Sequence, residues 1–100
     1  MGKPEALVEV YLVKEIEKLG GIAYKFSSTA RRNVPDRLCA LPYGNTIYVE
    51  VKTAKGVLSK GQHKEFTRLT DLKQPVFILS SKEEVDELIV FIKQQWRKKQ

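Results

Sequence analysis

The stretch from Val34 to Lys52 constrains the fold of this 100-residue chain more than any other. Its second half, beginning at Thr46, alternates apolar and polar residues, which is typical of a strand with one face against a core. The short apolar segment Arg37–Leu41 precedes it, and the turn sequence Pro-Tyr-Gly-Asn lies between the two. The sequence therefore predicts an antiparallel hairpin in which Leu41 pairs with Thr46.

This hairpin brings charged side chains together at its open end. The predicted pairing places Asp36 beside positions 50 and 51, so the carboxylates of Asp36 and Glu50 converge with the ammonium group of Lys52 at a border with solvent. Neighbouring carboxylates repel each other unless a cation lies between them. Their hard oxygen atoms suit Mg²⁺ or Mn²⁺ better than Zn²⁺. The pattern predicts a divalent metal site; an ordinary surface Glu/Lys pair is the alternative.

Composition narrows the class of protein and its partners. A net charge of +6 and an isoelectric point near 9.5 suit a polyanionic partner. One cysteine, Cys39, and one histidine, His63, exclude an internal disulfide and a zinc finger. Cys39 is expected to be a small core residue in a reducing compartment. Without an apolar run of about 20 residues or a signal-peptide pattern, we expect a single cytoplasmic domain over residues 1–100 with no membrane partner.

Apolar residues recur at helical spacing in three segments, which begin near Pro4, at Ser59 and at Ser81. Each serine is followed three residues later by Gln or Glu, the capping-box pattern. Gly20 is expected to end the first helix.

Two further strands complete the predicted sheet. One covers residues 22–26, with Ile22, Tyr24 and Phe26 on one face. The other covers residues 76–79 and is apolar throughout, so we expect it to be buried on both faces. The resulting order, αβββαβα, predicts an α/β fold with one mixed sheet flanked by helices and the acidic hairpin near its middle.

The acidic hairpin also resembles a known motif. Pro-Asp at Pro35–Asp36, thirteen intervening residues, and Glu-x-Lys from Glu50 to Lys52 resemble the PD-(D/E)xK nucleases. The order of further motifs over roughly residues 5 to 80 resembles the VRR-NUC branch of that superfamily. These motifs are the first helix with its glutamates, Gly20–Gly21, Tyr24-Lys25-Phe26, Arg31-Arg32, Leu58-Ser59-x-x-Gln62 and the apolar strand at Val76.

The resemblance implies a role for each matching residue. Asp36, Glu50 and the backbone carbonyl of Val51 would hold the metal, and Lys52 would serve the attacking water. Glu9 would contact the metal through a water molecule, with Glu5 as the other candidate for this role. The resemblance implies five catalytic residues: Glu9, Asp36, Glu50, Lys52 and Gln62.

Three further expectations concern the surroundings of this site. Asn33 stands where the family commonly has glycine, and asparagine tolerates the left-handed backbone that such a position requires. Gln62 can act in the site while also capping its helix only if its side chain turns inward. Basic residues around the site are expected to contact DNA phosphates: Lys25, Arg31, Arg32, Arg37, Lys55 and Lys60.

The resemblance implies a Mg²⁺- or Mn²⁺-dependent DNA endonuclease of viral or bacterial type that acts on intracellular DNA. The chain is also similar to the Holliday-junction resolvases. This similarity implies that the enzyme favours branched DNA and works as a homodimer. A restriction-like or nicking nuclease without branch preference is one alternative. A catalytically idle DNA-binding module is another, although the intact set of Asp36, Glu50 and Lys52 argues against it.

Overall fold

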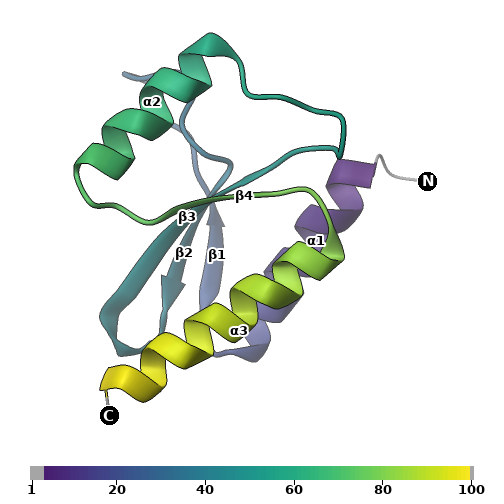
Figure 1. Ribbon diagram of the computed structural model, residues 1–100, viewed down its shortest axis with the longest axis vertical. Coiled ribbons are helices and arrows are strands. Elements are labelled where there is room, and N and C mark those ends of the chain that lie inside the picture. Colours follow the sequence, from purple (N-terminus) through teal and green to yellow (C-terminus); the bar gives the residue numbers. More distant parts are fainter. Residues whose placement is uncertain (1–3, 100) are drawn as a thin grey trace.

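The computed structural model describes residues 4–99 and shows an α/β fold with one mixed sheet (Figure 1). Helices and strands follow the predicted order αβββαβα, which is therefore confirmed. No helix within residues 4–99 combines the length and apolarity needed to cross a membrane. The elements are α1 (Pro4–Lys18), β1 (Ile22–Lys25), β2 (Arg37–Leu41), the 3₁₀ turn η1 (Pro42–Gly44), β3 (Asn45–Val51), α2 (Lys60–Asp71), β4 (Val76–Leu79) and α3 (Lys82–Lys99).

The four strands lie in the spatial order β1-β2-β3-β4. Strand β2 is antiparallel to both β1 and β3, whereas β4 runs parallel to β3 after the crossover through α2. Helices α1 and α3 pack against each other, and α2 lies apart from both (Figure 1). The acidic hairpin, β2–β3, thus occupies the middle of the sheet, as predicted.

The core lies between this sheet and the helices α1 and α3. Alternation along β3 turns Ile47, Val49 and Val51 inward, as the sequence predicts, and all three are buried. Cys39 is buried beside them, and desolvation raises the pKa of its thiol to about 11. It is therefore the core residue that its position predicts. The remaining buried members of this cluster are Val8, Leu12, Ile16, Ala23, Leu41, Leu79, Val85, Leu88, Ile89 and Ile92.

The hairpin register differs from the prediction by one residue. Leu41 pairs with Asn45 rather than with Thr46, whose partner is Ala40. The turn holds three residues, and Tyr43 adopts a left-handed conformation with φ of 66°. With this compact turn, β3 begins at Asn45, so the pairing starts one residue earlier.

The exposure of the outer strands contradicts one prediction, that β4 is buried on both faces. In β1 the buried residue is Ala23, whereas Ile22 and Tyr24 are about half exposed. Strand β4 is not buried on both faces, because Ile78 retains 46% of its exposure. Both strands lie at edges of the sheet, so each has a neighbouring strand on one side only.

Local signals place the helix ends. Ser59 and Gln62 form the complete capping box at the start of α2. At α3 only half of the capping box is formed. The Ser81 hydroxyl accepts from the backbone amide of Glu84, but the Glu84 carboxylate accepts from the amide and hydroxyl of Ser80 rather than from the amide of Ser81. Gly20, with φ of 89°, follows α1 in the left-handed conformation that ends helices.

Candidate active site

The carboxylates of Asp36 and Glu50 are interlocked across the hairpin. The backbone amide of Asp36 donates to Oε1 of Glu50 at 3.2 Å, and the amide of Val51 donates to Oδ2 of Asp36 at 3.1 Å. Each side chain is therefore fixed by the backbone of the opposite strand. The predicted placement of position 36 beside 50 and 51 is confirmed, although the register of the hairpin is shifted.

Glu50 is the most constrained carboxylate of this site. It is only 2% exposed, so the expectation that it borders solvent was wrong. The reason is that β3 is a central strand with α2 over its end. Its Oε2 accepts from Lys52 Nζ at 3.0 Å and from Gln62 Nε2 at 3.0 Å.

The electrostatics of Glu50 reflect this setting. Burial raises the pKa of its carboxyl, and the nearby charge of Asp36 raises it further. The hydrogen bond from Lys52 opposes this rise, as does the one from Gln62, but the net shift is upward. The ionised form is thus held at a cost that an additional cation would relieve.

Gln62 serves two partners at once. Its Oε1 accepts from the backbone amide of Ser59 at 3.1 Å, which completes the helix cap. Its Nε2 turns inward and donates to Glu50. The start of α2 is thereby tied to the centre of the sheet, and the side chain makes the inward turn that an active-site role would require while it also caps the helix.

Lys52 is fixed at the end of β3. Its backbone amide donates to the carbonyl of Leu79 at 2.9 Å, which extends the pairing with β4 beyond Val51. Its side chain is 22% exposed, so the ammonium group reaches Glu50 while remaining accessible from solvent. A cation in this position can stabilise negative charge on a bound phosphate.

Glu9 is held elsewhere, in an ion pair with Arg37. The distance from Arg37 Nε to Glu9 Oε2 is 2.8 Å, and Arg37 also donates to the carbonyl of Ala23 at 3.1 Å. Arg37 shares the α1-facing side of β2 with Cys39, whereas Glu50 lies on the opposite side of β3 from Val49. The predicted contact of Glu9 with a metal through water therefore stays a prediction, as does the DNA contact of Arg37.

The donor set at the hairpin suits a small, hard cation. Asp36 and Glu50 present oxygen ligands side by side, and the carbonyl of Val51 adjoins them in the chain. Within residues 4–99, no three His, Cys, Asp or Glu side chains are grouped closely enough to hold a metal together. Two carboxylates are what Mg²⁺ commonly takes from a protein, with water and phosphate oxygens completing the octahedron. The residues present therefore fit this ion.

The loop that leads to Asp36 has the backbone expected of it. Asn33 adopts φ of 68°, the left-handed conformation predicted for this position. It packs tightly on the start of α2, since a Cβ on Gly61 would lie 2.4 Å from Asn33 Nδ2. Five of the six expected DNA contacts are exposed, and their contacts with DNA remain predictions: Lys25, Arg31, Arg32, Lys55 and Lys60.

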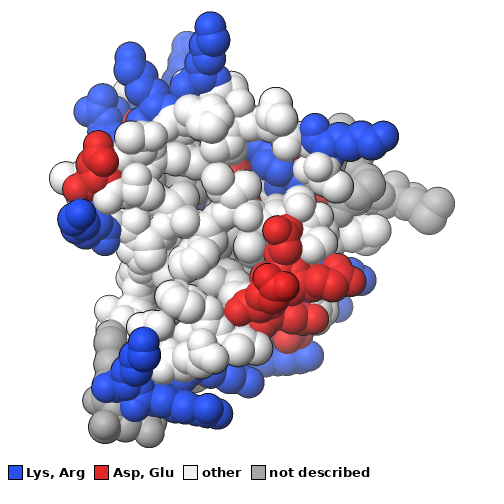
Figure 2. Space-filling view, in the orientation of Figure 1, with Lys and Arg blue, Asp and Glu red and all other residues white. Residues whose placement is uncertain are grey.

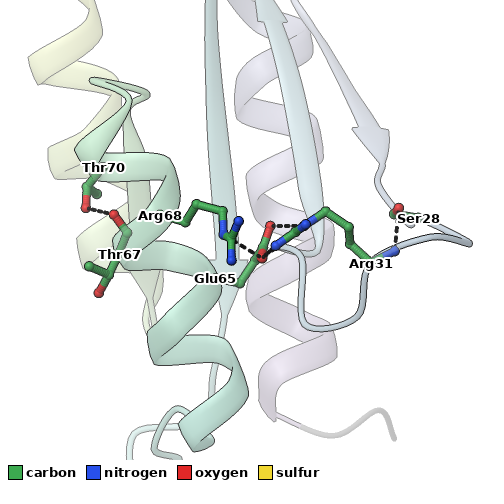
Figure 3. Close-up of polar contacts among 6 residues, drawn as sticks. All are labelled: Ser28, Arg31, Glu65, Thr67, Arg68 and Thr70. Carbon is green, nitrogen blue, oxygen red and sulfur yellow. Dashed lines mark hydrogen bonds and ion pairs between the residues drawn. The ribbon is translucent and has the colours of Figure 1, made fainter.

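Arg31 has a partner that sequence reasoning missed. It forms a two-pronged ion pair with Glu65 of α2 (Figure 3), with Nε at 3.2 Å from both carboxylate oxygens and Nη2 at 2.9 Å from Oε1. Arg68 lies 3.9 Å from the same carboxylate. The one signal in the sequence is the position of Glu65, which follows Gln62 by three residues and so lies on the same side of α2.

Lysine and arginine side chains project around α2 and near the end of α3, while Asp and Glu gather over the beginning of α3 (Figure 2). The basic residues of α2 thus lie on the same part of the molecule as Gln62. This distribution favours a polyanion approaching from the side of α2.

Two comparisons with known proteins agree with this geometry. The chain is 47% identical over 79 residues to "Putative nuclease p44" of Acyrthosiphon pisum secondary endosymbiont phage 1, covering 79% of this chain and 85% of that protein. A solved structure described as "VRR_NUC domain" superposes with a TM-score of 0.84 at 34% identity, covering 88% of this chain and 96% of the other. No family model matches the sequence.

Likeness of this degree in both sequence and structure, over nearly the whole length of both relatives, extends well beyond the acidic motif. The chain belongs to the VRR-NUC family of nucleases.

Proposed function

We propose that this protein is a Mg²⁺- or Mn²⁺-dependent DNA endonuclease whose active centre is the open end of the β2–β3 hairpin. The observation that carries the proposal is the interlocked pair of Asp36 and Glu50, with Lys52 and Gln62 both bonded to Glu50 Oε2. A carboxylate that is 2% exposed beside a second carboxylate is expensive to keep for structural reasons alone. The phage relative, named "Putative nuclease p44", supports the same reaction class.

The residues divide the work of phosphodiester hydrolysis among them. Asp36, Glu50 and the carbonyl of Val51 would hold the metal, which when bound supplies Lewis-acid polarisation of the phosphate and a lowered pKa for water. Lys52 stabilises charge that develops on the phosphate oxygens. Gln62 holds the Glu50 carboxylate in one orientation, so that its oxygens stay directed into the site.

For the substrate, we propose branched DNA cut by a homodimer. One chain of this size has one such hairpin and can cut one strand at a time, whereas resolving a junction needs two symmetrical cuts. A two-fold dimer supplies two sites at a fixed separation. The net charge of +6 supports binding to phosphates without base readout, so selection would rest on the shape of the branch.

A substrate series tests this function. A labelled four-way junction, a linear duplex of the same sequence and a single strand are each incubated with Mn²⁺ or with EDTA, and light scattering gives the oligomeric state. We expect a dimer that cuts the junction fastest and leaves 5′-phosphates, only when Mn²⁺ is present. Equal rates on duplex and junction from a monomer would contradict the branch-specific part, and cleavage in EDTA would contradict the metal.

A further inference from the structure

A second basic site lies beside the active centre. An open cavity of about 290 Å³ is formed where the loop before Asp36 meets α2. Four cations and one carboxylate line it, a net charge of +3, and Asn33 and Gly61 close one side. The charged lining residues are Arg31, Arg32, Lys64, Glu65 and Arg68.

Helix geometry brings α2 to this cavity on one face. Gly61, Lys64, Glu65 and Arg68 follow the spacing of residues that share one side of a helix. Gln62, which holds Glu50, lies less than one turn from Glu65, a rise of about 4.5 Å along the axis. The cavity therefore adjoins the active centre through the first turns of α2.

Glu65 has an unusual setting for a helix carboxylate. It is 8% exposed although α2 is amphipathic and polar residues on this helix are otherwise exposed or half-buried. Arg31 approaches it with the Nε–Nη2 edge of its guanidinium, so the Nη1 end points away from the carboxylate (Figure 3). The arginine fork is thereby held in one orientation, with donors remaining for a second acceptor.

Together these features point to an anion with several acceptor oxygens. We propose that the cavity binds a backbone phosphate of the nucleic-acid strand near the scissile one, and that Glu65 is the positioning residue that orients Arg31 for it. Arg68, which is more than half exposed, supplies a second guanidinium. This inference rests on the proposed function, because the ligand is the substrate of the neighbouring site.

Charge and position make opposite predictions for Glu65, which gives a sharp test. Glu65→Gln removes one negative charge and so raises the net charge of the cavity. If Glu65 only neutralised the surrounding cations, the variant protein would bind DNA more tightly than the wild type. The amide nitrogen of glutamine, however, is a donor facing the donors of Arg31. One of the hydrogen bonds would be lost, and the guanidinium of Arg31 would no longer be held in one orientation. We expect weaker DNA binding by Glu65→Gln, and recovery in Glu65→Asp, which restores a carboxylate.

The binding measurements use the full chain with a fluorescent duplex in EDTA, by anisotropy over a series of salt concentrations. Arg68→Ala removes an exposed side chain and is expected to lower affinity about five- to tenfold at 0.1 M salt, with the salt slope reduced by about 0.9. Lys93→Ala, which removes a cation from α3, is the matched control and should leave the slope close to that of the wild type.

Single neutral methylphosphonates along the strand identify the phosphate. One position near the cleaved bond should weaken binding by the wild type more than binding by Arg68→Ala, which retains only the Arg31 contact with this phosphate. The phosphate site is overturned if Arg68→Ala behaves like Lys93→Ala, and the positioning role if Glu65→Gln binds more tightly. Because binding is measured without metal, a wild type that fails to cleave would end the proposed nuclease function and leave this result standing on its own.

Discussion

Gln62 donates from Nε2 to Oε2 of Glu50 at 3.0 Å, and this bond joins the first turn of α2 to the central strand of the sheet. The same side chain completes the helix cap through Ser59. One residue thus couples the position of α2, with its basic face, to the orientation of a buried carboxylate.

This coupling predicts that capping and catalysis separate by mutation. Gln62→Ala removes both bonds, whereas Ser59→Ala removes only a capping bond. Each variant should lose about 0.5–1.5 kcal/mol in free energy of unfolding, measured in urea. Cleavage should fall strongly in Gln62→Ala alone. Equal cleavage by the two variants would show that Gln62 acts only as a cap.

Lys52 and Lys55 should separate chemistry from binding. Lys52→Ala is expected to lower the single-turnover cleavage rate at least ~100-fold, as removal of a group that stabilises transition-state charge does. Its DNA affinity in Ca²⁺ should change little. Lys55→Ala, in the exposed loop that follows, should weaken binding and leave the saturated rate intact. A proportional loss of rate and affinity in Lys52→Ala would reduce this lysine to a phosphate contact.

The pKa of Glu50 predicts how stability depends on pH. Burial raises this pKa above its usual 4.5, so the folded protein retains a proton that the unfolded chain releases. The stability from this group is present below the unfolded pKa and is lost as the pH rises through the folded pKa. In EDTA, the wild type should therefore lose stability relative to Glu50→Gln from about pH 4.5 upward. Glu87→Gln, at an exposed carboxylate, should follow the wild type. A constant difference between wild type and Glu50→Gln across pH would contradict the raised pKa.

Glu9 and Glu5 provide a test of the helix carboxylate. The family resemblance predicts that Glu9→Ala lowers cleavage and that Glu5→Ala does not. Glu9 also pairs with Arg37, so Arg37→Ala is measured beside it. A rate loss in Glu9→Ala that exceeds the loss in Arg37→Ala supports a role at the metal. Matching losses in these two variants would limit Glu9 to the ion pair.

The sequence predicts those features that depend on local periodicity and on turn chemistry. Alternation along β3 identified the buried face, and the capping box identified the start of α2. The hairpin register was wrong by one residue because Tyr43 enters a left-handed turn, which no propensity of tyrosine indicates. The meeting of Asp36 with Glu50 survived this error, since a one-residue shift still leaves position 36 beside 50 and 51.

Contacts between segments far apart in the sequence were harder to predict. The pairing of Arg31 with Glu65 spans 34 residues and joins an irregular loop to a helix. No periodic pattern in the sequence therefore predicts this contact. The exposure of Ile22 and Ile78 depends on which strands lie at the edges of the sheet. The order of the strands is set by the packing of the whole domain. The local sequence pattern of an apolar strand carries no information about this order.

The central claim is that the hairpin carboxylates carry a metal-dependent nuclease reaction, and cleavage of labelled four-way junction DNA in Mn²⁺ by Asp36→Asn tests it most directly. Asp71→Asn, at an exposed carboxylate at the end of α2, is the matched control. We predict that Asp36→Asn folds, shows no Mn²⁺ binding by titration calorimetry and cuts no DNA, while Asp71→Asn cuts at the wild-type rate. Full cleavage by a clean preparation of Asp36→Asn would contradict the assignment of the active centre.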